Sequence, residues 1–122
     1  MTNDIFESAV RTAGDLVGIF EFDSGGGYFY LFDLTQPRGS QARAALRVNA
    51  SGSDIEASHV EVRWSAAQDV VGLYIGDQLW AAFDQHGRKY GGDYDALKSP
   101  SIPSAISERF RVSSMQRELR AS

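Results

Sequence analysis

Three carboxylates near the start of the chain have the spacing that acid–base chemistry would use. Glu21 and Asp23 are two residues apart in an apolar stretch, so in a β-strand they project to the same face. Asp33 ends the next apolar stretch, and an antiparallel partner strand would bring it near them. Carboxyl groups held close together raise the pKa of one of them, as glycosidases require. We favour the simpler interpretation that these residues lie around the solvent-exposed end of a hairpin.

The two histidines predict neither a metal site nor a catalytic centre. His59 lies in an expected strand and His86 in a glycine-bounded loop, whereas a zinc site needs three or four converging ligands. The chain has no cysteine and no Gly-x-Ser-x-Gly elbow, so a nucleophilic hydrolase is not indicated. The glycine run at 25–27 lacks the Lys-Ser or Lys-Thr of a phosphate-binding loop. We therefore expect a protein that is not an enzyme and that holds no cofactor or metal.

The stretch from Asp84 to Asp95 holds the strongest candidates for contact with a partner. Tyrosines supply contact area and aspartates complement a basic protein. The alternative is a turn whose tyrosines pack under the sheet. The predicted partner-binding residues are Asp84, His86, Tyr90, Asp93, Tyr94 and Asp95.

Short strands must position these side chains. Residues 16–22 and 28–34 are apolar on both faces, which is typical of central strands covered on each side, and the glycine run between them predicts a hairpin turn. Further strands are expected at 43–49, 59–65, 70–75 and 78–83, with a glycine-first turn at Gly76-Asp77. The first dozen residues could form a short helix or another strand, because both accept Ile5 and Val10.

The segment from Ser104 to Arg120 is predicted to be helical. Ser104 is a candidate N-cap, and acidic Glu108 early with basic Arg117 late suits the helix dipole. Its apolar residues do not form one stripe, so a break near 113–114 is the alternative. The expected fold is α+β: a single domain over residues 1–122, mainly an antiparallel β-meander of five to seven strands with a C-terminal helix.

The composition of the chain disfavours further classes of function. The 122 residues are 43% hydrophobic, enough for a core without disulfides, and 16 acidic against 12 basic residues give a net charge of −4. Nucleic-acid binders usually carry a basic stripe, so this class is disfavoured. No window approaches the roughly 18 apolar residues of a membrane span, and the N-terminus does not resemble a signal peptide. We expect a soluble, cytoplasmic protein that contacts neither nucleic acid nor membrane.

Two short motifs resemble a known family. Phe20-Glu21, the glycine turn and Gly27-Tyr28-Phe29-Tyr30 are similar to the pattern of small bacterial proteins called domain of unknown function 2251, and Trp64-Ser65 fits its later strand. The chain departs from the pattern at Phe22, where the family has an acid, which argues against a fixed acidic cluster. The resemblance spans roughly residues 15–90 and implies no activity, since the family has no assigned catalytic residues.

The leading hypothesis is a non-catalytic binding protein. Small size and acidity fit an immunity protein that binds and neutralises a basic bacterial toxin, because opposite charge speeds capture. The alternative is a small-ligand-binding or sensor domain in which Tyr28 and Tyr30 form one wall of a pocket. An enzyme using Glu21, Asp23 or Asp33 is the weakest hypothesis.

Overall fold

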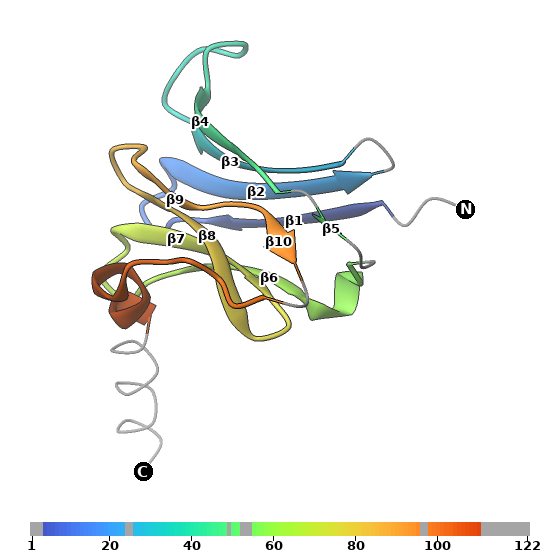
Figure 1. The fold of residues 1–122 in the computed structure, drawn as a ribbon. Coiled ribbons are helices and arrows are strands. Elements are labelled where there is room, and N and C mark those ends of the chain that lie inside the picture. The colour runs from blue at the N-terminus through green and yellow to red at the C-terminus, as the bar shows by residue number, and fades with distance from the viewer. Residues whose placement is uncertain (1–3, 24–25, 49, 52–54, 96–97, 111–122) are drawn as a thin grey trace.

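The computed structural model describes residues 4–23, 26–48, 50–51, 55–95 and 98–110, and about half of these residues lie in two four-stranded antiparallel sheets (Figure 1). The first sheet contains, in order, β1 (Ile5–Val10), β2 (Leu16–Asp23), β3 (Gly26–Asp33) and β4 (Ala42–Arg47). The second contains β6 (Val60–Trp64), β7 (Val70–Ile75), β8 (Gln78–Asp84) and β9 (Lys89–Gly91). The short strands β5 (Ala50–Ser51) and β10 (Tyr94–Asp95) pair in parallel, and η1 (Ala57–His59) is a single 3-10 turn.

The predicted fold class is confirmed, with more strands than expected. The 16–34 hairpin forms where its apolar stretches and glycine run predicted it, and the 60–83 meander forms where the apolar alternation predicted it. The N-terminal segment is a strand, in which Ile5 is buried and the adjacent Phe6 exposed, as a period of two requires. At the β7–β8 turn both Gly76 (φ 58°) and Asp77 (φ 68°) have positive φ, so the turn is of the I′ kind and not the glycine-first kind.

The main core lies between the two sheets. Phe20, Phe29 and Phe83 are fully buried there, and the rings of Phe29 and Phe83 stack with centroids 5.0 Å apart. The sheets approach closely at Gly18, where a Cβ atom would lie 2.6 Å from Cγ2 of Val71. A side chain at this point would push the layers apart.

A second apolar cluster covers the other face of the second sheet. Residues 104–110 are helical, and Phe110 packs with Val70, Leu79 and Ala82 on that face. Residues 111–120 of the predicted helix lie outside the described residues. Across the described ranges, no helix has both the length and the apolar character needed to cross a bilayer.

Among the described residues, no sheet or helix packs on the outward face of the first sheet, so the prediction that strands 16–22 and 28–34 are covered on each side is wrong for that face, although Val17 is buried there among its neighbours. The second sheet and the helical segment both lie on the same side of it (Figure 1). The outward face carries Phe6 with 62% of its surface exposed and Tyr28 with 41%. Aromatic residues on both faces of a hairpin therefore do not require two buried faces.

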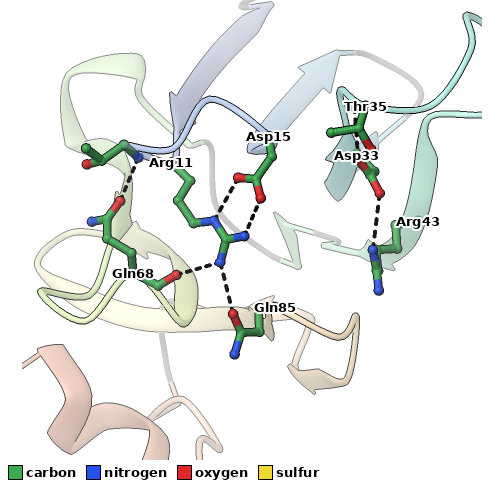
Figure 2. Close-up of polar contacts among 8 residues, drawn as sticks. Arg11, Asp15, Asp33, Thr35, Arg43, Gln68 and Gln85 are labelled. Atoms are coloured by element: carbon green, nitrogen blue, oxygen red, sulfur yellow. Dashed lines mark hydrogen bonds and ion pairs between the residues drawn. The ribbon is translucent and has the colours of Figure 1, made fainter.

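Arg11 ties the ends of the two sheets together (Figure 2). Its Nε and Nη2 atoms donate to the Asp15 carboxylate at 2.9 and 2.5 Å, within the β1–β2 connection. Its Nη1 atom donates to the Gln68 backbone oxygen at 3.1 Å and to Oε1 of Gln85 at 3.0 Å, in the β6–β7 and β8–β9 turns. Chiefly through the hydrogen bonds from Arg11, the pKa of Asp15 is lowered to about 2.

Candidate functional site

The three carboxylates with acid–base spacing do not come together. The β2–β3 register puts Asp23 at the turn of the hairpin and Asp33 at its open end. Asp33 accepts hydrogen bonds from the backbone nitrogen (3.0 Å) and hydroxyl (2.6 Å) of Thr35, and its other oxygen pairs with Arg43 at 3.3 Å (Figure 2). The bonds from Thr35 above all, and then Arg43, lower the pKa of Asp33. Asp33 is therefore held away from Glu21 and Asp23. The enzyme hypothesis needed these three carboxylates close together.

The histidines lie apart from each other and on the surface. Nδ1 of His59 is 3.8 Å from the Glu56 carboxylate, and His86 is exposed in the β8–β9 turn. Among the residues that the structure describes, no three histidine, aspartate or glutamate side chains are grouped as metal ligands would be.

The predicted partner-binding residues fall into two groups at opposite ends of β9. Oδ1 of Asp84 accepts hydrogen bonds from the backbone nitrogens of His86 (2.9 Å) and Arg88 (3.0 Å), so this carboxylate shapes the β8–β9 turn. Asp93 and Asp95 follow the other end of β9. The six residues therefore lie at and around a strand of only three residues, and their contact with a partner stays a prediction.

Both tyrosines of this stretch are partly buried, as the alternative interpretation of the loop had it. Tyr90 packs against the cluster that holds the helix. Tyr94 packs at the edge of the main core, where its ring meets that of Trp80 edge to face, with centroids 4.9 Å apart and planes at 78°. Tyr94 thus fixes a buried tryptophan that the sequence had not marked as functional.

A pocket of about 630 Å³ opens beside this aromatic pair, and we call it the Trp80 pocket. Trp80, Tyr94 and the backbone at 91–92 form its apolar wall. Its polar lining comes from two acidic residues, one lysine and two serines: Asp93, Asp95, Lys98, Ser99 and Ser101. Three of the predicted partner-binding residues, Asp93, Tyr94 and Asp95, therefore line a concave site.

A β-bulge and a close backbone crossing build the Trp80 pocket. The β7–β8 register shifts between Leu73 and Tyr74, which leaves Trp80 as an additional residue on β8. The chain then crosses closely over Trp80: Gly92 donates its N–H to the Trp80 carbonyl at 3.0 Å. At Gly91, with φ of 76°, a Cβ atom would lie 2.2 Å from that carbonyl oxygen, so only glycine fits.

The outward face of the first sheet is the second candidate. Its residues form three rows of Cα neighbours across β1 to β4, namely Phe6-Glu21-Tyr28-Arg47, Ser8-Ile19-Tyr30-Ala45 and Val10-Val17-Phe32-Ala42. We call this surface the aromatic face. Along β3 the Tyr28 and Tyr30 rings stack with centroids 6.0 Å apart, and Phe32 meets Tyr30 edge to face at 5.8 Å.

Tyr30 lies at the centre of the aromatic face, close to acidic side chains. The pKa of the Tyr30 phenol is raised, first because the ring is partly desolvated and then because Glu21, Tyr28 and Asp23 lie near it. The face therefore combines aromatic contact area with two acidic residues, Glu21 and Asp23, and with Arg47, the Cα neighbour of Tyr28 on β4. Strand alternation places all these residues on one side, but the sequence did not show that this side is uncovered.

A family model described as "Uncharacterized protein conserved in bacteria (DUF2251)" matches residues 2–110. The matched range includes both sheets and the helical segment at 104–110. No curated protein and no solved structure matches the chain. The match confirms the resemblance carried by the hairpin and the Trp64-Ser65 motif and extends it to nearly the whole chain.

Proposed function

The chain belongs to the DUF2251 family of uncharacterised bacterial proteins, and from its geometry we propose that it is a non-catalytic binding protein that docks a basic protein on the aromatic face. The observation that carries this proposal is the uncovered, tyrosine-rich sheet surface. Antiparallel sheets that face water on one side normally present polar residues there. Here Phe6, Val10 and Tyr28 are among the most exposed large hydrophobic side chains of the described residues.

An exposed apolar surface of this kind is typical of an interaction site. Contiguous apolar patches are uncommon on monomeric proteins, and tyrosine and phenylalanine are enriched at interfaces. Tyr28 and Tyr30 support each other by ring stacking, so they are ordered before a partner arrives. Their immobilisation then costs less entropy on binding.

Charge favours a basic partner. The whole chain carries a net charge of −4, and Glu21 and Asp23 lie beside the tyrosines on the aromatic face. Opposite charge steers a basic protein toward this face and accelerates association. More specifically, we propose that the protein is a cytoplasmic immunity protein and that its partner is a basic bacterial toxin.

The test first asks whether a neighbouring gene encodes a toxin, and then measures binding of that toxin by surface plasmon resonance. Tyr28→Ser should weaken binding by about 30-fold or more, since a central interface tyrosine contributes about 2 kcal/mol. His86→Ala and the double variant Asp93→Lys with Asp95→Lys test the loop at 84–95. Normal binding by Tyr28→Ser with slowed association of the double variant would place the partner on the loop instead. No binding by the wild-type protein would overturn the proposal.

The alternative, a small-ligand-binding domain, is not supported at Tyr28 and Tyr30, but the Trp80 pocket offers another site for a ligand. Their rings lie on an open sheet surface, whereas the Trp80 pocket is concave and is lined by several polar residues. A small-molecule site is usually a mostly apolar cavity with a few placed polar groups. A ligand-binding role therefore belongs with the Trp80 pocket.

A further inference from the structure

One carboxylate of the aromatic face lies between two exposed aromatic side chains. The antiparallel registers of β1, β2 and β3 pair Glu21 with Phe6 on one side and with Tyr28 on the other. All three side chains are exposed, Phe6 to 62% and Tyr28 to 41%. Neighbouring strands are about 4.8 Å apart, so the two flanking side chains start about 10 Å from each other, with the carboxylate between them. This row therefore presents an acid between two rings to solvent.

Glu21 is not used to hold the fold together. Asp15, Asp33 and Glu61 each accept a hydrogen bond from an arginine of this chain. By contrast, Glu21 has no hydrogen-bond or ion-pair partner among the residues that the structure describes. Aromatic ring faces also attract cations. A carboxylate without such a partner, flanked by rings, is therefore suited to a cation from outside the chain.

The surroundings of Glu21 suit a planar cation on an aliphatic stem. One face of the Tyr28 ring stacks on Tyr30. The other face is on the side away from Tyr30, and the next position on that side of β3 is Gly26, which has no side chain. Ile19, two residues before Glu21 on the same face of β2, is half-buried and offers apolar surface to the stem. The row thus combines a ring face, a carboxylate and an apolar contact.

We propose that the partner places an arginine side chain between Phe6 and Tyr28, where its guanidinium pairs with Glu21. This inference rests on the proposed function, because it names the group by which the aromatic face recognises a basic protein. A guanidinium is planar, so it can stack on a ring while its N–H groups pair with a carboxylate, whereas the ammonium group of lysine is a point charge. Arg47, beyond Tyr28 on β4, already takes part in an interaction within the chain.

The first experiment titrates two peptides of equal charge, acetylated hexa-arginine amide and acetylated hexalysine amide, into isotope-labelled protein at about 20 mM salt. Because both are attracted to the acidic protein, the difference between them isolates the guanidinium. Hexa-arginine should bind at least about threefold more tightly and should shift the NMR signals of Phe6, Glu21 and Tyr28. Equal affinities, no binding of hexa-arginine, or shifts confined to other residues would overturn the proposal.

The second experiment repeats both titrations with matched variants. Glu21→Gln should remove the preference for hexa-arginine, because it removes the charge that pairs with the guanidinium. Glu108→Gln removes the same charge at an exposed position beside the other sheet and should keep the preference. Tyr28→Leu keeps an apolar contact without a ring face and should lower the preference about twofold or more. Phe32→Leu, two rows away on the same strand, should not. Equal behaviour within either pair would refute the assignment.

The arginine site and the docking of the toxin fail in different ways. The peptide titrations use the protein alone, so they report on the site whatever the neighbouring gene encodes. If Tyr28→Ser weakens toxin binding but Glu21→Gln has no more effect than Glu108→Gln, docking stands and the arginine site is refuted. If hexa-arginine binds at Glu21 and the toxin does not bind, the arginine site stands and the toxin assignment is refuted. A second copy of this chain seated on the face would appear as a dimer in sedimentation and block the titration, which would overturn the inference.

Discussion

Gly91 is the single residue on which the Trp80 pocket depends most. It adopts a left-handed φ of 76° and lies where the chain crosses the Trp80 carbonyl. The bulged Trp80 belongs to the apolar strand β8, whereas Gly91 ends the short strand β9 in a stretch that is polar in sequence. Because Gly91 has no side chain, the backbone can pass close to the Trp80 carbonyl on its way from β9 to β10.

We expect Gly91→Ala to destabilise the protein by at least about 3 kcal/mol, since it adds a backbone clash to an unfavourable φ. Gly39→Ala is the control: Gly39 also has a positive φ, of 93°, but a Cβ atom there meets nothing within 4 Å. It should cost only about 1–2 kcal/mol. Urea denaturation measures both, and equal losses would show that the close crossing is not important.

The lowered pKa of Asp15 should make the free energy of unfolding depend on pH in the acidic range. Its pKa falls from 3.8 to about 2 in the folded protein, so its ionised form stabilises the fold above 3.8 and this contribution is lost as pH falls toward 2. The free energy of unfolding of Asp15→Asn should therefore lie below that of the wild type by a constant amount above about pH 5. The two curves should converge between about pH 4 and 2. A gap that persists at the lowest pH would assign the effect to packing and not to ionisation.

Among the elements, the helical segment at 104–110 depends on the second sheet. Its Phe110 is 3% exposed and meets Tyr74 edge to face, with ring centroids 5.5 Å apart. A helix this short is not stable alone, so packing must hold it in place.

Phe110→Ala should cost about 3–5 kcal/mol, the usual loss for a buried phenylalanine. Backbone amides of residues 104–110 should also exchange hydrogen faster. Glu108→Ala, at an exposed position of the same helix, should change stability by less than about 0.5 kcal/mol. Thermal unfolding and hydrogen exchange check both, and slow exchange in Phe110→Ala would mean that other contacts hold the helix.

For the whole molecule, the aromatic face is an apolar surface open to water. Phe6 and Val10 are 62% and 56% exposed, so replacing them removes little buried area. The double variant Phe6→Ser with Val10→Thr should keep the free energy of unfolding within about 1 kcal/mol of the wild type. It should also bind less of the dye ANS, which reports exposed apolar surface. Unchanged dye binding would show that the dye sits elsewhere and that the face is less accessible than its exposure indicates.

The sequence by itself determined the local elements. Apolar stretches on both sides of a glycine run predicted the strands in residues 16–34, and alternation predicted those in residues 60–83, because one face of each strand must reach the core. It also left the N-terminal segment open between helix and strand, since Ile5, Phe6 and Val10 have helix-like spacing and a strand would also accept Ile5 and Val10. The hairpin and Trp64-Ser65 motifs were enough to indicate the family.

Only the tertiary structure decided what each strand face meets. Alternation says which side chains share a face, but whether that face is buried depends on where the second sheet packs, and it packs on one side of β2 and β3 alone. Likewise Trp80 and Asp93 share a pocket through a bulge and a chain crossing, which pair residues distant in sequence. Such contacts depend on long-range packing, which no local spacing encodes.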